Sequence, residues 1–374
     1  MVGDIGMKAD LGQRDVDFIL SNSIDFHCHG VGPFDFTEIH DIDLEKIEAI
    51  LAGRKRHSIL TLYLPKPSFD IFLELMDRFD EGKKKGRYPH ITGFGLEGPL
   101  LASHGGTPEK GVWMPSEKHW ELLSDCGRKG LVYVIFSPDY QLPGSNFVNA
   151  QESPSITWIT ETLLKGGVLP APGHFTKSDP TASAEQLQII FDIVSRWGRG
   201  PILTDHLYND MPHNFKHAWR TDEEKLKRDI EIKALNLESW SWDTLTEDLG
   251  PVPAIILRNA RKGLVKVCQN FDGEHVDLAI VKRTIELVGA ENMLMMTDSI
   301  ESKRLAGRDL RMHEGSTLLY QDEDIVAAGS QDVNKQVNNM IDMGLTLEEV
   351  SLITRVSPEY LLKKREDYLS RIAR

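Results

Sequence analysis

The amino-acid sequence predicts an α/β fold of the (β/α)8 TIM-barrel class. Three observations support this prediction. Short apolar runs recur along the 374 residues, amphipathic helical stretches separate them, and polar residues stand where several runs end. Near-continuous apolar strands that alternate with helices are typical of a parallel sheet covered on its outer face. Eight such units favour a closed barrel. A doubly wound open sheet is the alternative, but it would not bring the ends of eight strands to one mouth.

The predicted strands are short, and most of them are nearly continuous in apolar residues. They span residues 23–29, 58–64, 91–96, 131–137, 168–174, 201–207, 263–270 and 293–297. The helical patterns between them include residues 43–53, 69–81, 116–128, 183–197 and 275–288. A run of helices is expected to end the chain.

The chain is expected to hold one large domain with one long insert. Residues 1–22 are predicted to be an N-terminal extension, and residues 23–374 the barrel with its C-terminal helices. The connection at about residues 211–250 is highly charged and then aromatic, with Trp240 and Trp242. A connection of this length is usually functional or flexible. The alternative is a surface insert without a role in chemistry, since loops accept insertions freely.

Composition and charge narrow the class of protein. Hydrophobic residues make up 40% and charged residues 27% of the chain, as in ordinary globular proteins. The formal net charge of −14 disfavours nucleic acid and anionic membranes as partners, because both need a basic surface. The three cysteines lack metal-finger spacing and fit a reducing compartment. Without a recognisable signal peptide or membrane span, the sequence predicts a cytoplasmic protein.

Six polar residues stand at the predicted C-terminal ends of strands, where catalytic groups gather in a barrel. They are His27, His29, Glu97, His174, His206 and Asp298. His27 and His29 are two residues apart on one strand, so both imidazoles share a face and can reach one metal ion. A lone His-x-His pair is more often packed or surface-exposed than a ligand pair. Singly, Asp298 could cap a helix and His174 could hold a core hydrogen bond, but all six together favour one site.

This set of side chains suits a hydrolytic metal centre. Neutral imidazoles and carboxylates are ligands for zinc or iron(II), and a carboxylate can bridge two ions. Such an ion converts bound water to hydroxide near neutral pH, which is the nucleophile a hydrolase needs. Asp298 is then free to take the proton of the water and return it to the leaving group.

The order of these motifs resembles the amidohydrolase superfamily, and within it the N-acetylglucosamine-6-phosphate deacetylases. The resemblance covers residues 23 to about 362, and the set of motifs is specific although no single member is. The matching stretches are Asp25-Phe-His-Cys-His-Gly30, Gly95-Leu-Glu-Gly-Pro99, Gly173-His-Phe-Thr176, Asp205-His-Leu-Tyr-Asn-Asp-Met211, Asp272-Gly-Glu-His-Val276, Met296-Thr-Asp-Ser299, Ala328-Gly-Ser330 and Ser357-Pro358.

The resemblance implies a role for each candidate residue. Glu97, His174 and His206 would hold the principal metal ion, while His27 and His29 would permit a second. The predicted fourth strand has no lysine to be carboxylated, so Glu97 would supply the bridging ligand. One or two divalent ions are expected, zinc first, with iron or manganese as alternatives.

The resemblance also implies roles around the substrate. Asp298 would be the general acid and base, and His275 would lie over the substrate and polarise its carbonyl. Asn209 matches a contact to the sugar phosphate, and its neighbour Asp210 is placed in the same substrate site. The family's phosphate-binding arginine has no clear match, and Arg220 is the substitute we place in the site.

The sequence departs from the family pattern where substrate is held. A loop histidine that contacts the sugar hydroxyls is replaced by Pro108, with His104 as a substitute. Lys216 and His217 are further candidates for the missing arginine, which relatives send to a neighbouring subunit's ligand, so a homodimer is the oligomer to test. The family's small β-sandwich is expected to be reduced or absent.

The leading hypothesis is a metal-dependent hydrolase that removes an N-acyl group, in the first place acetyl, from a small-molecule substrate. That substrate is expected to be an amino sugar or an amino sugar phosphate. We expect the preferred substrate to differ from N-acetylglucosamine 6-phosphate, with Trp240 or Trp242 at the mouth. One alternative is hydrolysis of another amide, such as an N-acyl amino acid or a cyclic amide. A catalytically silent metal-binding barrel is another, but it has no physical need to keep Asp298 beside five ligands.

Overall fold

The computed structural model describes residues 12, 14–150, 153–211, 215, 218–322 and 324–372. Most of the predicted N-terminal extension, residues 1–11 and 13, therefore lies outside the described residues. Residues 14–20 are helical and lead into the first strand.

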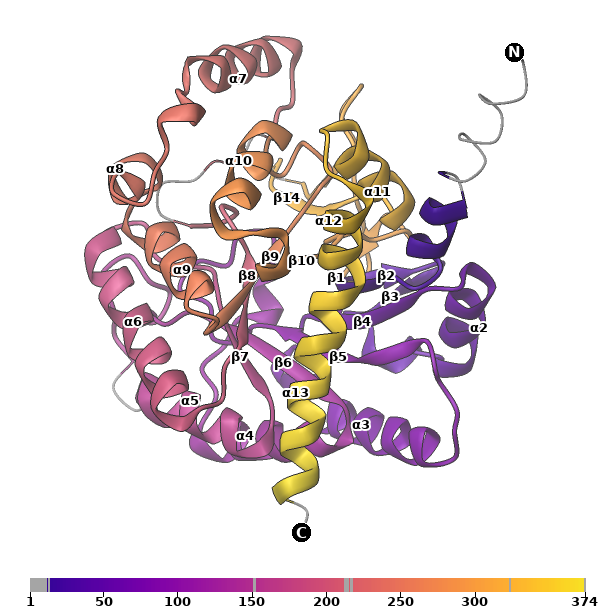
Figure 1. The fold of residues 1–374 in the computed structure, drawn as a ribbon. Helices are drawn as coiled ribbons and strands as arrows, with labels where there is room; N and C mark the ends of the chain where they lie inside the picture. The colour runs from indigo at the N-terminus through magenta and orange to yellow at the C-terminus, as the bar shows by residue number, and fades with distance from the viewer. Residues whose placement is uncertain are drawn as a thin grey trace.

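Parallel strands form the centre of the described chain, in two hydrogen-bonded ladders of five and three strands (Figure 1). The first ladder contains, in spatial order, β1 (Ile24–Cys28), β4 (His57–Leu62), β5 (Ile91–Glu97), β6 (Leu131–Phe136) and β7 (Leu169–Pro172). The second contains β8 (Ile202–His206), β9 (Val265–Gln269) and β10 (Met293–Met295). Each overlaps one of the runs predicted to be a strand.

The two ladders meet on both sides. On one side β7 contacts β8. On the other, the N–H of Asp298 donates to the carbonyl oxygen of His27 at 2.9 Å, and the N–H of His29 donates to that of Ser299 at 2.8 Å. The result is a curled parallel sheet in a mixed α/β fold, compatible with the predicted TIM barrel. Apolar side chains fill both faces of the strands, as expected for a parallel sheet covered by helices.

Helices surround the strands (Figure 1). Several begin at a side chain that caps the first turn: the carboxylates of Asp43, Asp179 and Asp277 and the hydroxyl of Ser155 each accept a backbone N–H. The helices are α2 (Leu44–Arg54), α3 (Phe69–Lys84), α4 (Glu117–Asp125), α5 (Ile156–Gly166), α6 (Pro180–Trp197), α9 (Pro251–Arg261), α10 (Leu278–Val288), α11 (Val333–Asp342), α12 (Leu347–Ser351) and α13 (Ser357–Ile372). Within the described ranges, none is long and apolar enough to cross a lipid bilayer.

Apart from an isolated bridge between Arg311 and Tyr320, antiparallel pairing among the described residues occurs in three short two-stranded pairs. They are β2 (Gly30–Val31) with β3 (Phe34–Asp35), β11 (Arg304–Leu305) with β12 (Arg308–Asp309), and β13 (Leu318–Tyr320) with β14 (Val326–Gly329).

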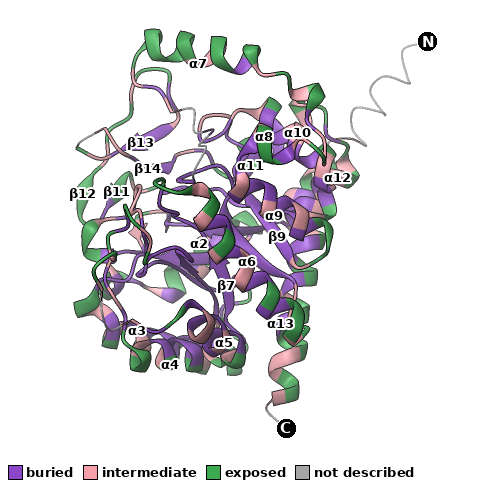
Figure 2. Cartoon of the chain, turned by 90° about the vertical axis from the view of Figure 1, so that its left-hand side faces the viewer, coloured by how far each residue is buried: buried purple, intermediate pink, exposed green. Residues whose placement is uncertain are grey.

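The long insert contains α7 (Asp222–Ala234), the short 3-10 turn Leu237–Ser239 and α8 (Leu245–Leu249). Helix α7 protrudes from the body and is exposed over most of its surface (Figure 2). The insert begins beside the β13–β14 pair, because the hydroxyl of Tyr320 donates to the carbonyl oxygen of Trp219 at 2.8 Å.

A buried tyrosine ties the first ladder together from inside. The hydroxyl of Tyr133 on β6 donates to the carbonyl oxygen of Phe26 at 2.8 Å and lies 2.7 Å from the hydroxyl of Thr61. Its ring crosses the face of β5 at Gly95, where an added Cβ would lie only 2.2 Å from Cζ of the ring. Gly95 is two residues before Glu97 and shares its face. Because Gly95 has no side chain, the ring of Tyr133 fits against β5 two residues before Glu97.

We predict that Gly95→Ala destabilises the protein by about 1–3 kcal/mol, the usual result of overpacking a filled core. The urea midpoint measures this loss. Gly53→Ala is the matched control, because a Cβ at Gly53 in α2 meets nothing within 4 Å; it should be neutral or stabilising by about 0.5–1 kcal/mol. Equal midpoints for the two variants would contradict the packing described here.

Candidate metal centre

The end of β1 presents two imidazoles to the interior of the curled sheet. The Nε2 atoms of His27 and His29 lie 2.9 Å apart, and both residues are buried. Cys28 faces the other way, with Sγ 3.1 Å from the hydroxyl of Ser58. This alternation is the one predicted for a strand. Nδ1 of His29 lies 3.3 Å from the carbonyl oxygen of Thr61, so a proton on Nδ1 leaves Nε2 available as a ligand.

Glu97 ends β5 and stands between two groups of histidines. Its Oε2 lies 3.1 Å from Nε2 of His27 and 3.3 Å from Nε2 of His29, while Oε1 lies 3.0 Å from Nε2 of His174. The hydroxyl of Thr107 donates to Oε1 at 2.8 Å. Although burial raises the pKa of Glu97, the contacts with the three histidines hold it well below its usual value. The carboxylate is therefore ionised, as a metal ligand must be.

His174 and His206 follow β7 and end β8, and their rings lie 5.2 Å apart between centroids. Nδ1 of His174 lies 3.0 Å from the carbonyl oxygen of Ser103 and 3.1 Å from Oδ2 of Asp210. These acceptors hold the Nδ1 proton, so that Nε2 faces Glu97. Burial lowers the pKa of His174, but nearby carboxylates, first that of Asp205, raise it well above its usual value. The position is therefore one that favours positive charge.

Asp298 lies three residues beyond the end of β10, between His29 and His275. Its Oδ1 is 3.1 Å from Nε2 of His29, and its Oδ2 is 3.5 Å from Nε2 of His275. Nδ1 of His275 is 2.5 Å from Oδ2 of Asp272, which fixes the ring. Burial raises the pKa of Asp298, yet the neighbouring histidines hold it well below its usual value. A buried, ionised carboxylate thus stands beside His29 and His275. It belongs to a different group of donors from Glu97 and His174.

The donor atoms converge as two groups: His27, His29 and Asp298, and Glu97, His174 and His206. Within each group the ligand atoms lie within 4.8 Å of one another, and all six residues are buried. Ligands of a tetrahedral zinc ion at about 2.1 Å are themselves about 3.4 Å apart. The nitrogen–oxygen distances around Glu97, 3.0 to 3.3 Å, are close to that separation. The residues therefore fit one or two divalent ions, and the site remains a predicted metal centre.

A small cavity of about 20 Å³ lies over these donors. It is enough for about one water molecule, which needs roughly 10–15 Å³. Gly105 and Gly106 line it opposite Val326 and Ala327 of β14. The two sides are in close contact, because a Cβ on Gly106 would lie 2.3 Å from the carbonyl oxygen of Val326. An amino sugar can therefore enter only if these segments separate.

Three of the predicted substrate residues line the cavity: Asn209, Asp210 and His275. Oδ1 of Asn209 is buried and has no hydrogen-bond partner among the described residues, so it is available to a ligand. Asp210 is already engaged, since its Oδ1 lies 2.8 Å from Nζ of Lys177 and its Oδ2 faces His174. Asp210 can therefore orient the ring of His174, and it also lines the cavity that a substrate would enter.

Arg220 does not line the cavity. Its guanidinium donates to the carbonyl oxygen of Asp324, at 2.7 Å from Nη2, and lies 5.5 Å from the ring centroid of Tyr320. Lys216 and His217, the other candidates for a phosphate contact, lie outside the described residues. His104 is half-buried, and its Nδ1 is 3.3 Å from the carbonyl oxygen of Thr107.

The prediction that Trp240 or Trp242 lines the mouth is wrong. Trp240 is only 3% exposed and belongs to the main hydrophobic core, where its ring centroid lies 5.8 Å from that of Phe215. Trp242 packs against the same core, with the guanidinium of Arg261 4.7 Å from its ring. Large indole surfaces gain most from such burial, and they fix the insert to the body instead of contacting the cavity.

Sequence reasoning missed several residues that surround the donors. The hydroxyl of Tyr63 lies 2.9 Å from Nε2 of His29, and the two rings are stacked. Tyr63 directly follows β4, so the rule of polar strand ends could have found it. Asp272 stands in one of the matching motifs, but the sequence assigns it no role. In the structure its carboxylate contacts Nδ1 of His275. Thr107 carries no sequence signal, because only the folded loop brings its hydroxyl to Glu97.

The arrangement is a mixed α/β fold in which a buried set of histidines and carboxylates gathers at the ends of parallel strands. Solved structures of N-acetylglucosamine-6-phosphate deacetylases share the fold. The enzyme from Pasteurella multocida is 15% identical, with 92% of this chain and 77% of that chain covered and a TM-score of 0.63. The enzyme from Thermotoga maritima is 16% identical, with 91% and 78% covered and a TM-score of 0.63.

A third deacetylase, from Mycobacterium smegmatis, was solved in complex with N-acetyl-D-glucosamine-6-phosphate. It is 17% identical, with 91% of this chain and 77% of that chain covered and a TM-score of 0.62. At these identities the similarity concerns the fold, and at that level it confirms the resemblance to these deacetylases. No protein-family model and no curated protein sequence matches the chain.

We predict that Glu97→Gln lowers the affinity for divalent metal by at least about 10-fold, since even outer-shell partners of a metal ligand are worth 10–100-fold. Elemental analysis after dialysis against limiting zinc measures the effect. His104→Asn is the matched control, because His104 belongs to neither group of donors. Equal metal content in both variants would rule out Glu97 as a ligand.

Proposed function

We propose that the chain is a metal-dependent hydrolase of an N-acyl amide, first of all an N-acetyl amide of an amino sugar or amino sugar phosphate. One observation carries the proposal: buried histidines and Glu97 converge from the ends of several strands beside an ionised Asp298. The deacetylase fold supports the reaction type. We further propose that the two ladders form a single closed (β/α)8 barrel.

Glu97, His174 and His206 would hold the principal ion, and His27 with His29 a second. Zinc is the ion we propose, with iron or manganese as alternatives; when bound, it would polarise the scissile carbonyl and lower the pKa of a water ligand. Burial raises the pKa of Tyr63 well above its usual value, so its hydroxyl stays protonated. It can donate a hydrogen bond beside His29.

Asp298 would take the proton from the attacking water and pass it to the leaving nitrogen. Its low pKa keeps it ionised, and only the ionised carboxylate has a free lone pair for the proton of the water. His275, held by Asp272 on Nδ1, presents Nε2 toward Asp298 and the cavity. There it would orient the acyl group and stabilise charge on its oxygen.

We predict that Asp298→Asn lowers turnover by roughly two to four orders of magnitude, the usual worth of a positioned general acid or base. Steady-state release of acetate measures it, with bound metal determined on the same samples. Asp309→Asn on the exposed β12 is the control and should retain full turnover. Unchanged turnover of the metal-loaded Asp298→Asn protein would exclude this role.

The surroundings of the cavity support a substrate other than N-acetylglucosamine 6-phosphate. Among its described lining residues there is no lysine or arginine to meet a phosphate. Arg220 is turned to Asp324, and Lys177 is paired with Asp210. A charge-assisted contact to phosphate is worth about 1.5–3 kcal/mol, which a phosphorylated substrate would lack here. The neutral acyl amide and the sugar ring would then provide the binding.

We predict that kcat/KM for N-acetylglucosamine 6-phosphate lies below about 10⁵ per molar per second, the range of a well-adapted enzyme. A panel of N-acetyl amino sugars, with and without the 6-phosphate, is compared by released acetate. A kcat/KM for the phosphorylated sugar at or above that range would contradict the prediction. A preference of more than about 10-fold for the phosphorylated form would indicate that the protein contacts the phosphate.

A second candidate function is hydrolysis of another amide, such as an N-acyl amino acid or a cyclic amide. The absence of lysine and arginine among the described lining residues is compatible with it, since a neutral amide needs no cationic partner. Including N-acetyl amino acids and a cyclic amide in the same panel separates the two functions. A catalytically silent barrel would bind metal and turn over none of these substrates. Location in the cytoplasm and assembly as a homodimer stay predictions.

A further inference from the structure

A second cavity, of about 140 Å³, lies at the opposite end of the parallel strands from the candidate metal centre. It is bounded by α13 and by the segments that precede β7 and β8, so it sits at the N-terminal ends of these strands. The candidate metal ligands His174 and His206 lie at their opposite ends. A cavity of roughly 150 Å³ accepts a guest the size of benzene, so this one can hold a small ligand.

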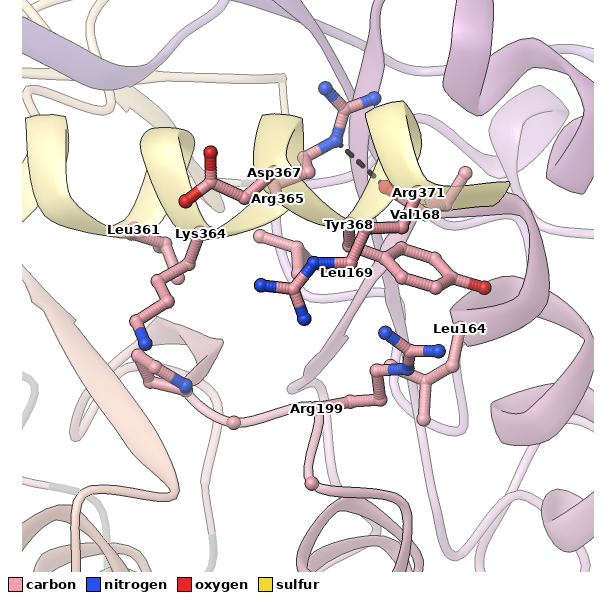
Figure 3. A pocket seen from close by; sticks show the side chains of 14 residues that line it. Leu164, Val168, Leu169, Arg199, Leu361, Lys364, Arg365, Asp367, Tyr368 and Arg371 are labelled. Atoms are coloured by element: carbon pink, nitrogen blue, oxygen red, sulfur yellow. Dashed lines mark hydrogen bonds between the residues drawn. The ribbon is translucent and has the colours of Figure 1, made fainter. Parts of the chain in front are cut away.

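Positive charge surrounds this cavity. Its lining includes four cationic residues and one carboxylate, that of Asp367: the cations are Arg199, Lys364, Arg365 and Arg371. No salt bridge joins any of the four to a carboxylate of the described residues. Figure 3 shows Arg199, Lys364 and Arg371 around the space between α13 and the facing loop. In a chain of net charge −14, the lining of this cavity thus has four cations and a single carboxylate.

Two of the arginines are held in place by the protein. Arg365 is buried, and its guanidinium donates to the carbonyl oxygens of Gly167 and Leu131 at 2.7 Å each, so it belongs to the packing of α13. The guanidinium of Arg199 stacks on the ring of Tyr368, with 3.4 Å between its central carbon and the ring centroid. Nε of Arg199 is buried and has no hydrogen-bond partner among the described residues. This donor is thus held in a fixed position with no acceptor.

We propose that this cavity is a binding site for a small phosphate-bearing anion. Guanidinium groups match phosphate oxygens in a bidentate manner, and an aromatic ring that fixes the guanidinium reduces the ordering required on binding. Arg199 and Arg371 supply the two planar donors, and Lys364 adds a mobile charge. Such a ligand satisfies Nε of Arg199 and balances the unpaired cations. The site is separate from the candidate metal centre and does not depend on the proposed hydrolysis.

Isothermal titration calorimetry at low ionic strength tests the proposal, with inorganic phosphate and glycerol 3-phosphate as separate probes. The full chain is expected to bind at one site per chain in this cavity, more weakly as salt is raised. Tighter binding of glycerol 3-phosphate identifies an organic phosphate as the ligand, and tighter binding of inorganic phosphate identifies the free ion.

The double variant Arg199→Gln/Arg371→Gln should weaken binding by at least about 10-fold. Arg196→Gln/Lys363→Gln is the matched control: it removes the same charge from exposed positions on α6 and α13 that do not line the cavity. If the first variant unfolds, Lys364→Gln replaces it, because Lys364 is exposed and its loss leaves the packing intact; a several-fold weakening is expected.

Glu97→Gln separates this site from the candidate metal centre and should leave the cavity's affinity unchanged. The proposal is overturned if neither probe binds at about 10 millimolar, or if the control variant loses as much affinity as the cavity variant. It is overturned equally if Glu97→Gln abolishes binding while the cavity variant retains it.

Discussion

The buried carboxylate of Glu97 is the group on which the rest of the candidate centre depends. An ionised carboxylate is costly to bury unless it is paired, and here its partners come from other segments: His27 and His29 from β1 and His174 from beyond β7. Each partner must therefore lie at the same height as the end of β5. The parallel register of the strands sets that height, and the ring of Tyr133, fitted against a glycine of β5, supports it from below. A shift of β5 by one residue would turn the carboxylate to the outer face and leave the imidazoles without it.

Much of this could be predicted from the sequence, because strand ends are a local signal. Each apolar run predicted to be a strand overlaps one in the structure, and His27, Glu97 and Asp298 lie where a run ends. Contacts made by loops could not be predicted in the same way. Thr107 reaches Glu97 only after its loop folds back. The tryptophans of the insert were misplaced for a related reason: the pattern shows that a residue is apolar, but whether it faces a cavity or the core depends on tertiary packing.

Chemistry and selectivity are divided between different parts of the fold. The donors stand on strands, whose positions are fixed by hydrogen-bonded ladders, whereas the cavity is covered by the Gly105–Gly106 turn and by β14. A side chain at Gly106 would collide with the carbonyl oxygen of Val326, so this cover depends on glycine. Loops can change without moving the strand ends. This separation explains how a chain only 15% identical to a solved deacetylase can share its fold while its loops differ.

The side chains that line the cavities at the two ends of β7 and β8 differ in charge. At their C-terminal ends the cavity is lined by carboxylates and imidazoles, and no lysine or arginine is among its described lining residues. At their N-terminal ends the cavity beneath α13 is lined by cations. Salt screens charges beyond about 10 Å, so the net charge of the chain does not decide where an anion binds; the nearest groups do. The proposed phosphate site therefore lies beneath α13, where the nearest groups are cations. The proposed hydrolysis of a neutral amide belongs at the other end, where a bound divalent ion would balance the developing negative charge.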